Sequence, residues 1–301
     1  MRKLLKISLW ALLSISALTA VLVAGVYVAS NHRLQHAYQI KPAAVALPTD
    51  SAALVRGQHI AQTRGCIDCH GTDLGGASVV DDPAIGHLHG PNLTRGQGGL
   101  PASFHDEDWV RAIRHGVNAE GRPLFLMPSQ EFAHMSDAEL GELIAYLKSA
   151  PPIDRARGPV SVGPVGRALM LAGKLPIAAE VIDHANLQPS TVKPGRTLEY
   201  GRYLAVGCIG CHGPNYTGGK IEAGPPDWPA AANLTPHPNG AVTRWTEADF
   251  MQTLRSGRRP NGTELNPAMP RNFGLMNDEE LGALWLFLKS LPAAPTGTKA
   301  A

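Results

Sequence analysis

The sequence of 301 residues has few aromatic side chains, 6% of the total, although 44% of its residues are hydrophobic. Its length is typical of two domains. Aromatic rings provide much of the bulk of a protein core, so two cores of this composition need another large apolar body at their centres. The formal net charge is only +2, and nothing in it points to nucleic acid as a partner.

Charged side chains are missing from one long stretch. Residues 7–32 contain no Lys, Arg, Asp or Glu, and the apolar part, Ile7 to Val28, is long enough to cross a bilayer. The basic residues Arg2, Lys3 and Lys6 precede it and are expected to stay in the cytoplasm. Residues 1–32 are therefore predicted to be an uncleaved single-pass anchor. The alternative is a signal peptide cleaved near Val28-Ala29-Ser30, although signal peptides usually have a shorter apolar region.

Long alternations of apolar and polar residues, typical of strands, are also missing. Glycine and proline instead separate segments of helical periodicity, so the predicted fold class is all-α. The predicted organisation is an anchor (1–32), a tether (33–52), a first domain (53–150), a Pro-rich linker with a short helix at 165–174 (151–193), a second domain (194–292) and a frayed tail (293–301).

All four cysteines lie in two copies of the pattern Cys-x-x-Cys-His. Two cysteines one helical turn apart can each form a thioether with a haem vinyl group, and the adjacent histidine then reaches the iron. The sequence therefore predicts two covalently bound haem c groups, one per domain, which would also be the missing apolar bodies of the cores. The residues predicted to hold them are Cys66, Cys69 and His70 in the first domain and Cys208, Cys211 and His212 in the second.

Zinc binding, a redox dithiol and a structural disulfide are the competing interpretations of a Cys-x-x-Cys pair. A single zinc site would draw all four cysteines together, yet each pair has its own histidine and the first cysteines are 142 residues apart, at positions 66 and 208. Thioredoxin-like chemistry needs a βαβ context, and no run of parallel strands surrounds either motif. A disulfide is the strongest of the three, because the expected compartment is oxidising.

The two predicted domains are copies of one fold. Residues 92–94 and 233–235 are both Asn-Leu-Thr, at an offset of 141, and further matches at this offset include Arg114 with Arg255 and Gly116 with Gly257. Each copy is predicted to have a helix before the haem motif (54–63 and 198–206), a middle helix that begins near Asp106 or Glu247 with Trp109 or Phe250 inward, and a last helix with a buried face. Capping boxes, Ser136 with Glu139 and Asn277 with Glu280, mark the start of the last helices.

The iron needs a second axial ligand opposite each histidine, and methionine is the best candidate. Met127 and Met269 each precede a proline and each lie 61 residues after the first cysteine of their motif, at positions 66 and 208. A thioether ligand raises the reduction potential and leaves no open site for oxygen or peroxide. The predicted metal ligands are therefore His70 with Met127 and His212 with Met269.

Other residues compete for these roles. Met135 and Met276 also recur at an offset of 141, but core filling is the commoner role of methionine. His87 and His89 precede Asn92 and are alternative ligands for the first haem. The remaining histidines are expected to be solvated or capping residues: His59, His105, His115, His134 and His184. Candidate donors to the haem propionates are Asn92, Thr94, Arg114, Asn233, Thr235, Trp245 and Arg255.

At this point a family resemblance is visible, mainly in the second domain. Its motifs are Tyr200-Gly201-Arg202-Tyr203-Leu204-Ala205, Asn233-Leu234-Thr235-Pro236 and Pro267-Ala268-Met269-Pro270, and the first domain has Leu126-Met127-Pro128-Ser129. They resemble the class I c-type cytochromes that serve as cytochrome subunits of bacterial alcohol and gluconate dehydrogenases. The resemblance implies two tandem class I cytochrome c domains, His/Met ligation, and electron transfer by haem domains in the periplasm, at the inner membrane.

Three functions follow from these expectations. The main one is a membrane-anchored carrier that passes electrons from a dehydrogenase or quinol-oxidising partner to a terminal oxidase or another carrier. Subunits of the resembled type often carry three haems, whereas this chain has two motifs, so a free-standing carrier and a cytochrome subunit are both compatible. The enzyme alternative is a dihaem peroxidase, which needs one open iron and an acid/base group. Glu131, near Met127, is a candidate acid, although an exposed loop carboxylate is the ordinary interpretation.

Overall fold

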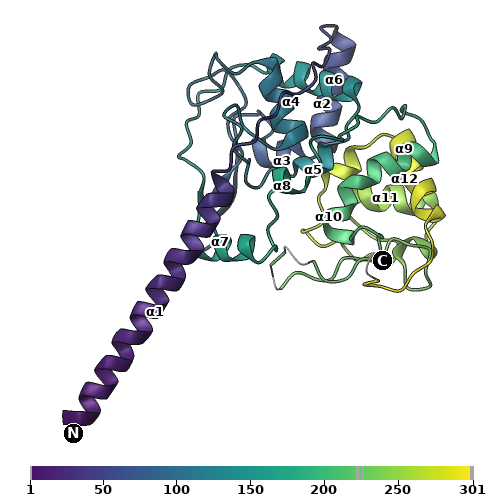
Figure 1. Cartoon of the computed structure of the whole chain (residues 1–301). Coiled ribbons are helices and arrows are strands. Elements are labelled where there is room, and N and C mark those ends of the chain that lie inside the picture. Colours follow the sequence, from purple (N-terminus) through teal and green to yellow (C-terminus); the bar gives the residue numbers. More distant parts are fainter. Residues whose placement is uncertain (1, 222–223, 226, 299–301) are drawn as a thin grey trace.

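The computed structural model describes residues 2–221, 224–225 and 227–298. Figure 1 shows a long helix that projects from two helical lobes, the first coloured blue to teal and the second green to yellow.

Residues 299–301 of the predicted tail lie outside the described residues. Residues before them are held on the second domain, where the Ala294 and Thr298 carbonyls accept hydrogen bonds from Asn233 (2.8 Å) and Thr217 (3.0 Å).

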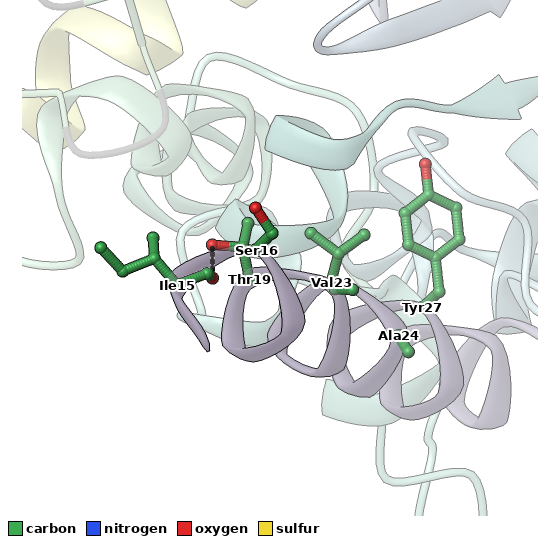
Figure 2. Close-up of a pocket in the computed structure, with 7 residues that line it drawn as sticks. Ile15, Ser16, Thr19, Val23, Ala24 and Tyr27 are labelled. Carbon is green, nitrogen blue, oxygen red and sulfur yellow. Dashed lines mark hydrogen bonds between the residues drawn. The ribbon is translucent and has the colours of Figure 1, made fainter. Parts of the chain in front are cut away.

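Helix α1, Arg2–Leu34, is long and apolar enough to cross a membrane, with a mean hydropathy of 2.2 over an 18-residue window. Its large apolar side chains are exposed along most of its length. Figure 2 shows part of this surface, where Ile15, Thr19, Val23 and Tyr27 lie along one face and the Thr19 hydroxyl donates to the Ile15 carbonyl at 2.8 Å. Such a surface is stable in lipid rather than in water.

The end of α1 is packed against the linker. The linker contains helices α7, Pro164–Leu171, and α8, Ala178–Val181, and α7 agrees with the short helix predicted there. Arg167 donates to the Ser30 hydroxyl at 2.6 Å, and its guanidinium lies 4.5 Å from the ring centre of Tyr27. Arg33 donates to Glu180 at 2.9 Å. Helix α1 therefore joins the globular part through side-chain contacts as well as through the chain.

The first domain is built from the predicted helices. Its helices are α2 (Ser51–Thr63), α3 (Cys66–His70), α4 (Asp106–His115), α5 (Ser129–Phe132) and α6 (Asp137–Ser149). Helix α2 begins where the Asp50 carboxylate accepts from the Ala53 amide at 2.9 Å. Gly57 lets α2 and α6 touch, because a Cβ there would lie 2.1 Å from the Glu142 carbonyl oxygen. The α2–α6 pair encloses a core that includes Trp109, which is 3% exposed.

The second domain repeats this arrangement. Its helices are α9 (Leu198–Leu204), η1 (Ala205–Cys208), α10 (Ile209–His212), η2 (Ala241–Thr243), α11 (Glu247–Ser256), η3 (Asn272–Leu275) and α12 (Asp278–Ser290). Gly201 takes the place of Gly57, since a Cβ on it would lie 1.9 Å from the Ala283 carbonyl oxygen of α12. Phe250 is buried in this core, as predicted. The repeat seen in the sequence is thus a repeat of helix packing.

One of the two predicted capping boxes is complete. Asn277 and Glu280 exchange both hydrogen bonds at the start of α12. At the start of α6 the Ser136 hydroxyl accepts from the Glu139 amide at 3.2 Å, but the Glu139 carboxylate accepts from the Tyr203 hydroxyl of the second domain instead of from the Ser136 amide. A contact between the domains has replaced half of the local motif.

The chain is mainly helical, not all-α as predicted. Strands β1, Ser78–Asp82, and β2, Gly86–His89, form an antiparallel hairpin, and β3, Ser161–Val162, pairs with β2 from the linker. These strands are too short for a clear alternating pattern, and β3 depends on a partner 70 or more residues earlier, so periodicity did not indicate them.

The segment expected to be a tether runs over the first domain. The Tyr38 amide donates to the Gly121 carbonyl at 2.9 Å. Val45 and Leu47 pack on the first core. The Ala46 carbonyl oxygen lies against Gly141 of α6, where a Cβ would be only 2.1 Å from it. This stretch is therefore a strap on the domain surface.

Candidate haem sites

Each Cys-x-x-Cys-His motif is helical and packs at the edge of its domain core, and in the second domain it is divided between η1, which ends at Cys208, and α10. In the first domain it is α3, which Gly65 precedes and Gly71 ends, both with positive φ, 75° and 80°. Only glycine adopts such angles without strain, so a glycine interrupts the helical conformation on each side of this turn. None of the four cysteines, all of which are described, forms a disulfide. Burial raises the pKa of Cys66 and of Cys208 to about 12, so both are neutral thiols before any bond to a cofactor forms.

The two motif histidines are held in the same way. Nδ1 of His70 lies 3.0 Å from the Pro91 carbonyl oxygen, and Nδ1 of His212 lies 2.7 Å from that of Ala232. A carbonyl can only accept, so Nδ1 carries the proton and Nε2 is the basic nitrogen. Burial lowers the pKa of both rings. Each histidine is thus a neutral, oriented imidazole, which is the form that binds a metal.

A second shared feature follows each motif. Leu74 and Tyr216 have φ of 59° and 58°, left-handed conformations that are unusual for such side chains, and they are only 2% and 6% exposed. Their carbonyls accept from the amides of Leu93 and Leu234, both at 2.8 Å. The strained turn is therefore hydrogen-bonded to the loop that contains Leu93 or Leu234. The same loop contains the carbonyl, of Pro91 or Ala232, that orients the motif histidine.

The second domain has a cavity beside its motif. The cavity has a volume of about 90 Å³ and opens to solvent. Cys208, His212 and Met269 all line it. So do Trp245, which was predicted to be near a haem, and Phe250. The structure thus brings together the motif and the predicted second ligand of this domain.

The four candidate methionines differ in their surroundings. Met135 and Met276 are 3% and 2% exposed and belong to the two hydrophobic cores. Met127 is partly buried against the first core, and Met269 is partly buried in the wall of the second cavity. Packing of this kind accounts for Met135 and Met276 as core residues.

Four buried side-chain polar atoms have no hydrogen-bond partner within the described protein: Nε1 of Trp109, Nε of Arg114, Oγ1 of Thr253 and Oδ1 of Asn272. The first three can donate and fit a haem, and Thr253 lines the second cavity. Buried donors are nearly always paired, and a haem propionate is a strong acceptor. Together with the thiols and the oriented imidazoles, these donors form a site that suits a covalently held haem.

The Asn-Leu-Thr loops have a different role from the predicted one. Asn92 Nδ2 donates to the Ile153 carbonyl at 2.7 Å, and Thr94 Oγ1 donates to Asn92 Oδ1 at 2.8 Å. Asn233 and Thr235 form the same pair at 2.8 Å. Their polar atoms join each loop to the chain that follows its last helix, so they are not free for propionates. Arg255 is also engaged, in an ion pair with Asp278 at the surface.

Several histidines that were expected to be solvated or capping residues instead have buried or paired side chains. His115 is 6% exposed, and its Nδ1 lies 3.1 Å from Nδ1 of His184. Burial lowers the pKa of His115 to about 4. His59 hydrogen-bonds to Glu280 across the domain interface. His87, a candidate ligand, lies on β2 and pairs with the exposed side chain of Asp81.

Glu131 is also placed differently from expectation. It is a half-buried residue of α5 that faces the motif of the other domain, since a Cβ on Gly210 would lie 3.3 Å from its Oε1. Burial raises the pKa of this carboxyl to about 7, and Arg64 partly opposes the rise. The sequence indicated this residue only as a candidate acid that is exposed on a loop, because its burial depends on a contact between the domains. The position 141 residues later is Asn272, so the second domain has no carboxylate at the corresponding place.

Repeated helical domains with a Cys-x-x-Cys-His turn beside an apolar cavity are the defining features of c-type cytochromes. The cytochrome c family model matches residues 54–151 and 198–292, and the chain belongs to this family. Membership implies covalently bound haem c and a role in electron transfer.

Curated relatives are about one quarter identical to this chain. The cytochrome c subunit of the quinone alcohol dehydrogenase of Gluconobacter oxydans is 26% identical over 292 residues, covering 85% of this chain and 58% of the relative. The fructose dehydrogenase cytochrome subunit of Gluconobacter japonicus is 25% identical, covering 93% and 60%. A diheme cytochrome c-type protein of Cereibacter sphaeroides is 28% identical, covering 79% and 86%. The chain thus spans about 60% of the length of the two dehydrogenase subunits.

Proposed function

We propose that this chain is a membrane-anchored dihaem cytochrome that transfers electrons at the periplasmic face of a bacterial inner membrane. Two haem c groups are attached through Cys66 and Cys69 and through Cys208 and Cys211. His70 with Met127 would bind one iron, and His212 with Met269 would bind the other. Haem held by these residues would supply one-electron chemistry between ferric and ferrous iron.

The observation that carries this proposal is the shared wall of the second cavity. Cys208, His212 and Met269 line one space, and His212 is oriented with Nε2 as its basic nitrogen. The first domain repeats the motif turn, the oriented histidine and the spacing of Met127. A weak thioether ligand favours the ferrous state and closes the iron to oxygen and peroxide, which suits a carrier.

The partner is proposed to be a redox protein. The relatives are cytochrome subunits of alcohol, fructose and gluconate dehydrogenases, so a membrane dehydrogenase is the proposed electron donor, and a terminal oxidase or another carrier the acceptor. Co-purification of a second polypeptide from membranes under mild detergent tests whether the chain is a subunit or a free-standing carrier.

The anchor is proposed to be retained. Tyr27 and Ser30, which lie at or before the candidate cleavage site, contact Arg167 of the linker, so removal of α1 would strip partners from α7. Mass spectrometry of the protein extracted from membranes tests this, because retention predicts a mass that includes residues 1–32.

The decisive experiment is spectroscopy of the oxidised, detergent-extracted protein followed by a potentiometric titration. Two haems per chain, two one-electron waves and a weak absorption near the red end of the spectrum, from methionine-to-ferric charge transfer, are expected. A high-spin component, or a spectral change with peroxide, would reveal an open iron and favour the dihaem peroxidase.

A further inference from the structure

The two haem motifs lie at the interface between the domains, and each is covered by the segment that follows the methionine of the other. In Figure 1 α5 of the first domain lies beside α10 of the second. Glu131 of α5 approaches Gly210 within motif two, and Asn272 of η3 approaches Gly65 before motif one. Asn272 lies 141 residues after Glu131, which is the offset of the repeat, so the two residues hold corresponding positions in their domains. Each domain therefore contacts the motif of the other domain through the same part of its fold.

The carboxylate of Glu131 is unpaired. It is half-buried, and within the described residues no hydrogen bond or ion pair holds it. Burial raises its pKa to about 7, and Arg64 is the cation that opposes this rise. Gly210 lets the carboxylate lie close to the motif, since a Cβ at residue 210 would be 3.3 Å from Oε1 of Glu131.

Motif one has the opposite arrangement. The residue that corresponds to Gly210 within the motif is Asp68, and the residue that corresponds to Glu131 is neutral Asn272. Asn272 is 8% exposed and donates to the Thr63 carbonyl at 3.0 Å. Asp68 itself is exposed to solvent. Motif two therefore has a half-buried carboxylate beside it that comes from the other domain.

A negative charge beside a haem stabilises ferric iron, which carries one more positive charge than ferrous iron. The interaction is stronger in a desolvated interface than in water, where solvent and salt screen it. Local charge and solvent exposure are among the factors by which a protein sets the potential of an iron centre.

We propose that Glu131 is a potential-setting residue for the haem of the second domain: the first domain supplies this carboxylate across the interface and thereby lowers the reduction potential of that haem. The inference rests on the proposed function, because it requires one haem at each motif. It makes the potential of the second haem depend on docking of the two domains.

The test is a redox titration of the full-length, detergent-extracted protein at about pH 9, where a carboxyl of this pKa is ionised. Glu131→Gln should move one of the two waves to higher potential and leave the other in place. Asn272→Asp places a carboxylate beside motif one and should lower the other wave, so the pair of variants assigns the waves.

Two controls separate charge from structure. Glu131→Asp retains the charge and should keep the wave near its wild-type position. Glu107→Gln removes an exposed carboxylate of α4 and should shift neither wave. If Glu131→Gln leaves both waves in place, or moves both equally, the inference is wrong although two reversible waves still support the proposed function. A wild-type protein without two waves would contradict the proposed function itself.

Discussion

His59 Nε2 lies 2.7 Å from Oε2 of Glu280, in the other haem domain. The equivalent residues, Tyr203 and Glu139, form the reciprocal hydrogen bond. The hydrogen bond to Glu280 raises the pKa of His59, against the effect of burial. The domains are thus joined by two related contacts, of which only one has a base that titrates near neutrality.

This contact predicts a pH-dependent interface. Because the folded pKa of His59 is above its ordinary 6.5, its contribution is complete below pH 6.5 and disappears as pH rises through the folded value. His59→Gln should therefore cost about 0.5–1 kcal/mol in acid and almost nothing in base, the scale of a partly exposed pair. Thermal unfolding of both proteins from acid to alkaline pH measures this.

Tyr203→Phe is the matched control for that experiment. It removes the reciprocal hydrogen bond to Glu139, so its loss of stability should not follow the histidine titration. A difference between wild type and His59→Gln that stays constant across this pH range would contradict the assigned origin of the pKa shift.

Met269 and Met276 offer a test of ligation against packing. Met269→Ala should lower the potential of one haem and leave its thioethers intact, because a sulfur ligand is lost. Met276→Ala should instead leave the potentials nearly unchanged and destabilise the second domain by about 2–5 kcal/mol, since the 2% exposed side chain fills the core. Potentiometry and denaturant unfolding of both variants distinguish the roles, and the reverse pattern would make Met276 the ligand.

Close packing of the first and last helices of each domain predicts a strong effect of a single methyl group. In Gly57→Ala the new Cβ would meet the Glu142 carbonyl at 2.1 Å, so α2 and α6 must separate, at a cost of about 1–3 kcal/mol or more. Gly158→Ala, where no atom lies within 4 Å, is the control and should be neutral. Thermal unfolding monitored through the haem absorption is the measurement, and equal stability of the two variants would contradict the helix contact.

The repeat and the spacing of local motifs made much of this molecule predictable. The order of Cys66 and His70 in one helical turn, and the start of α12 at Asn277, depend on residues a few positions apart. What could not be predicted depends on distant partners. The local sequence predicts that Glu139 completes a capping box, but its carboxylate accepts from Tyr203 of the other domain. Glu131 was expected to be exposed, but it lies against α10 of the other domain. Strand β3 is two residues long and has no pattern of its own.

The junction between the anchor and the linker predicts resistance to proteolysis. Arg33 donates to Glu180 and to the Met170 carbonyl, the latter at 2.7 Å, so its side chain is engaged and poorly available to trypsin. Glu180→Gln should weaken this hold and speed the release from membranes of a soluble fragment that begins at Leu34. Glu142→Gln, which frees Arg56 on the domain surface instead, should not change the rate of that release. Limited proteolysis followed by mass spectrometry measures both rates. Equal release from wild type and Glu180→Gln would mean that the side-chain contacts do not protect the junction, and that the haem domains are connected to the membrane by the chain alone.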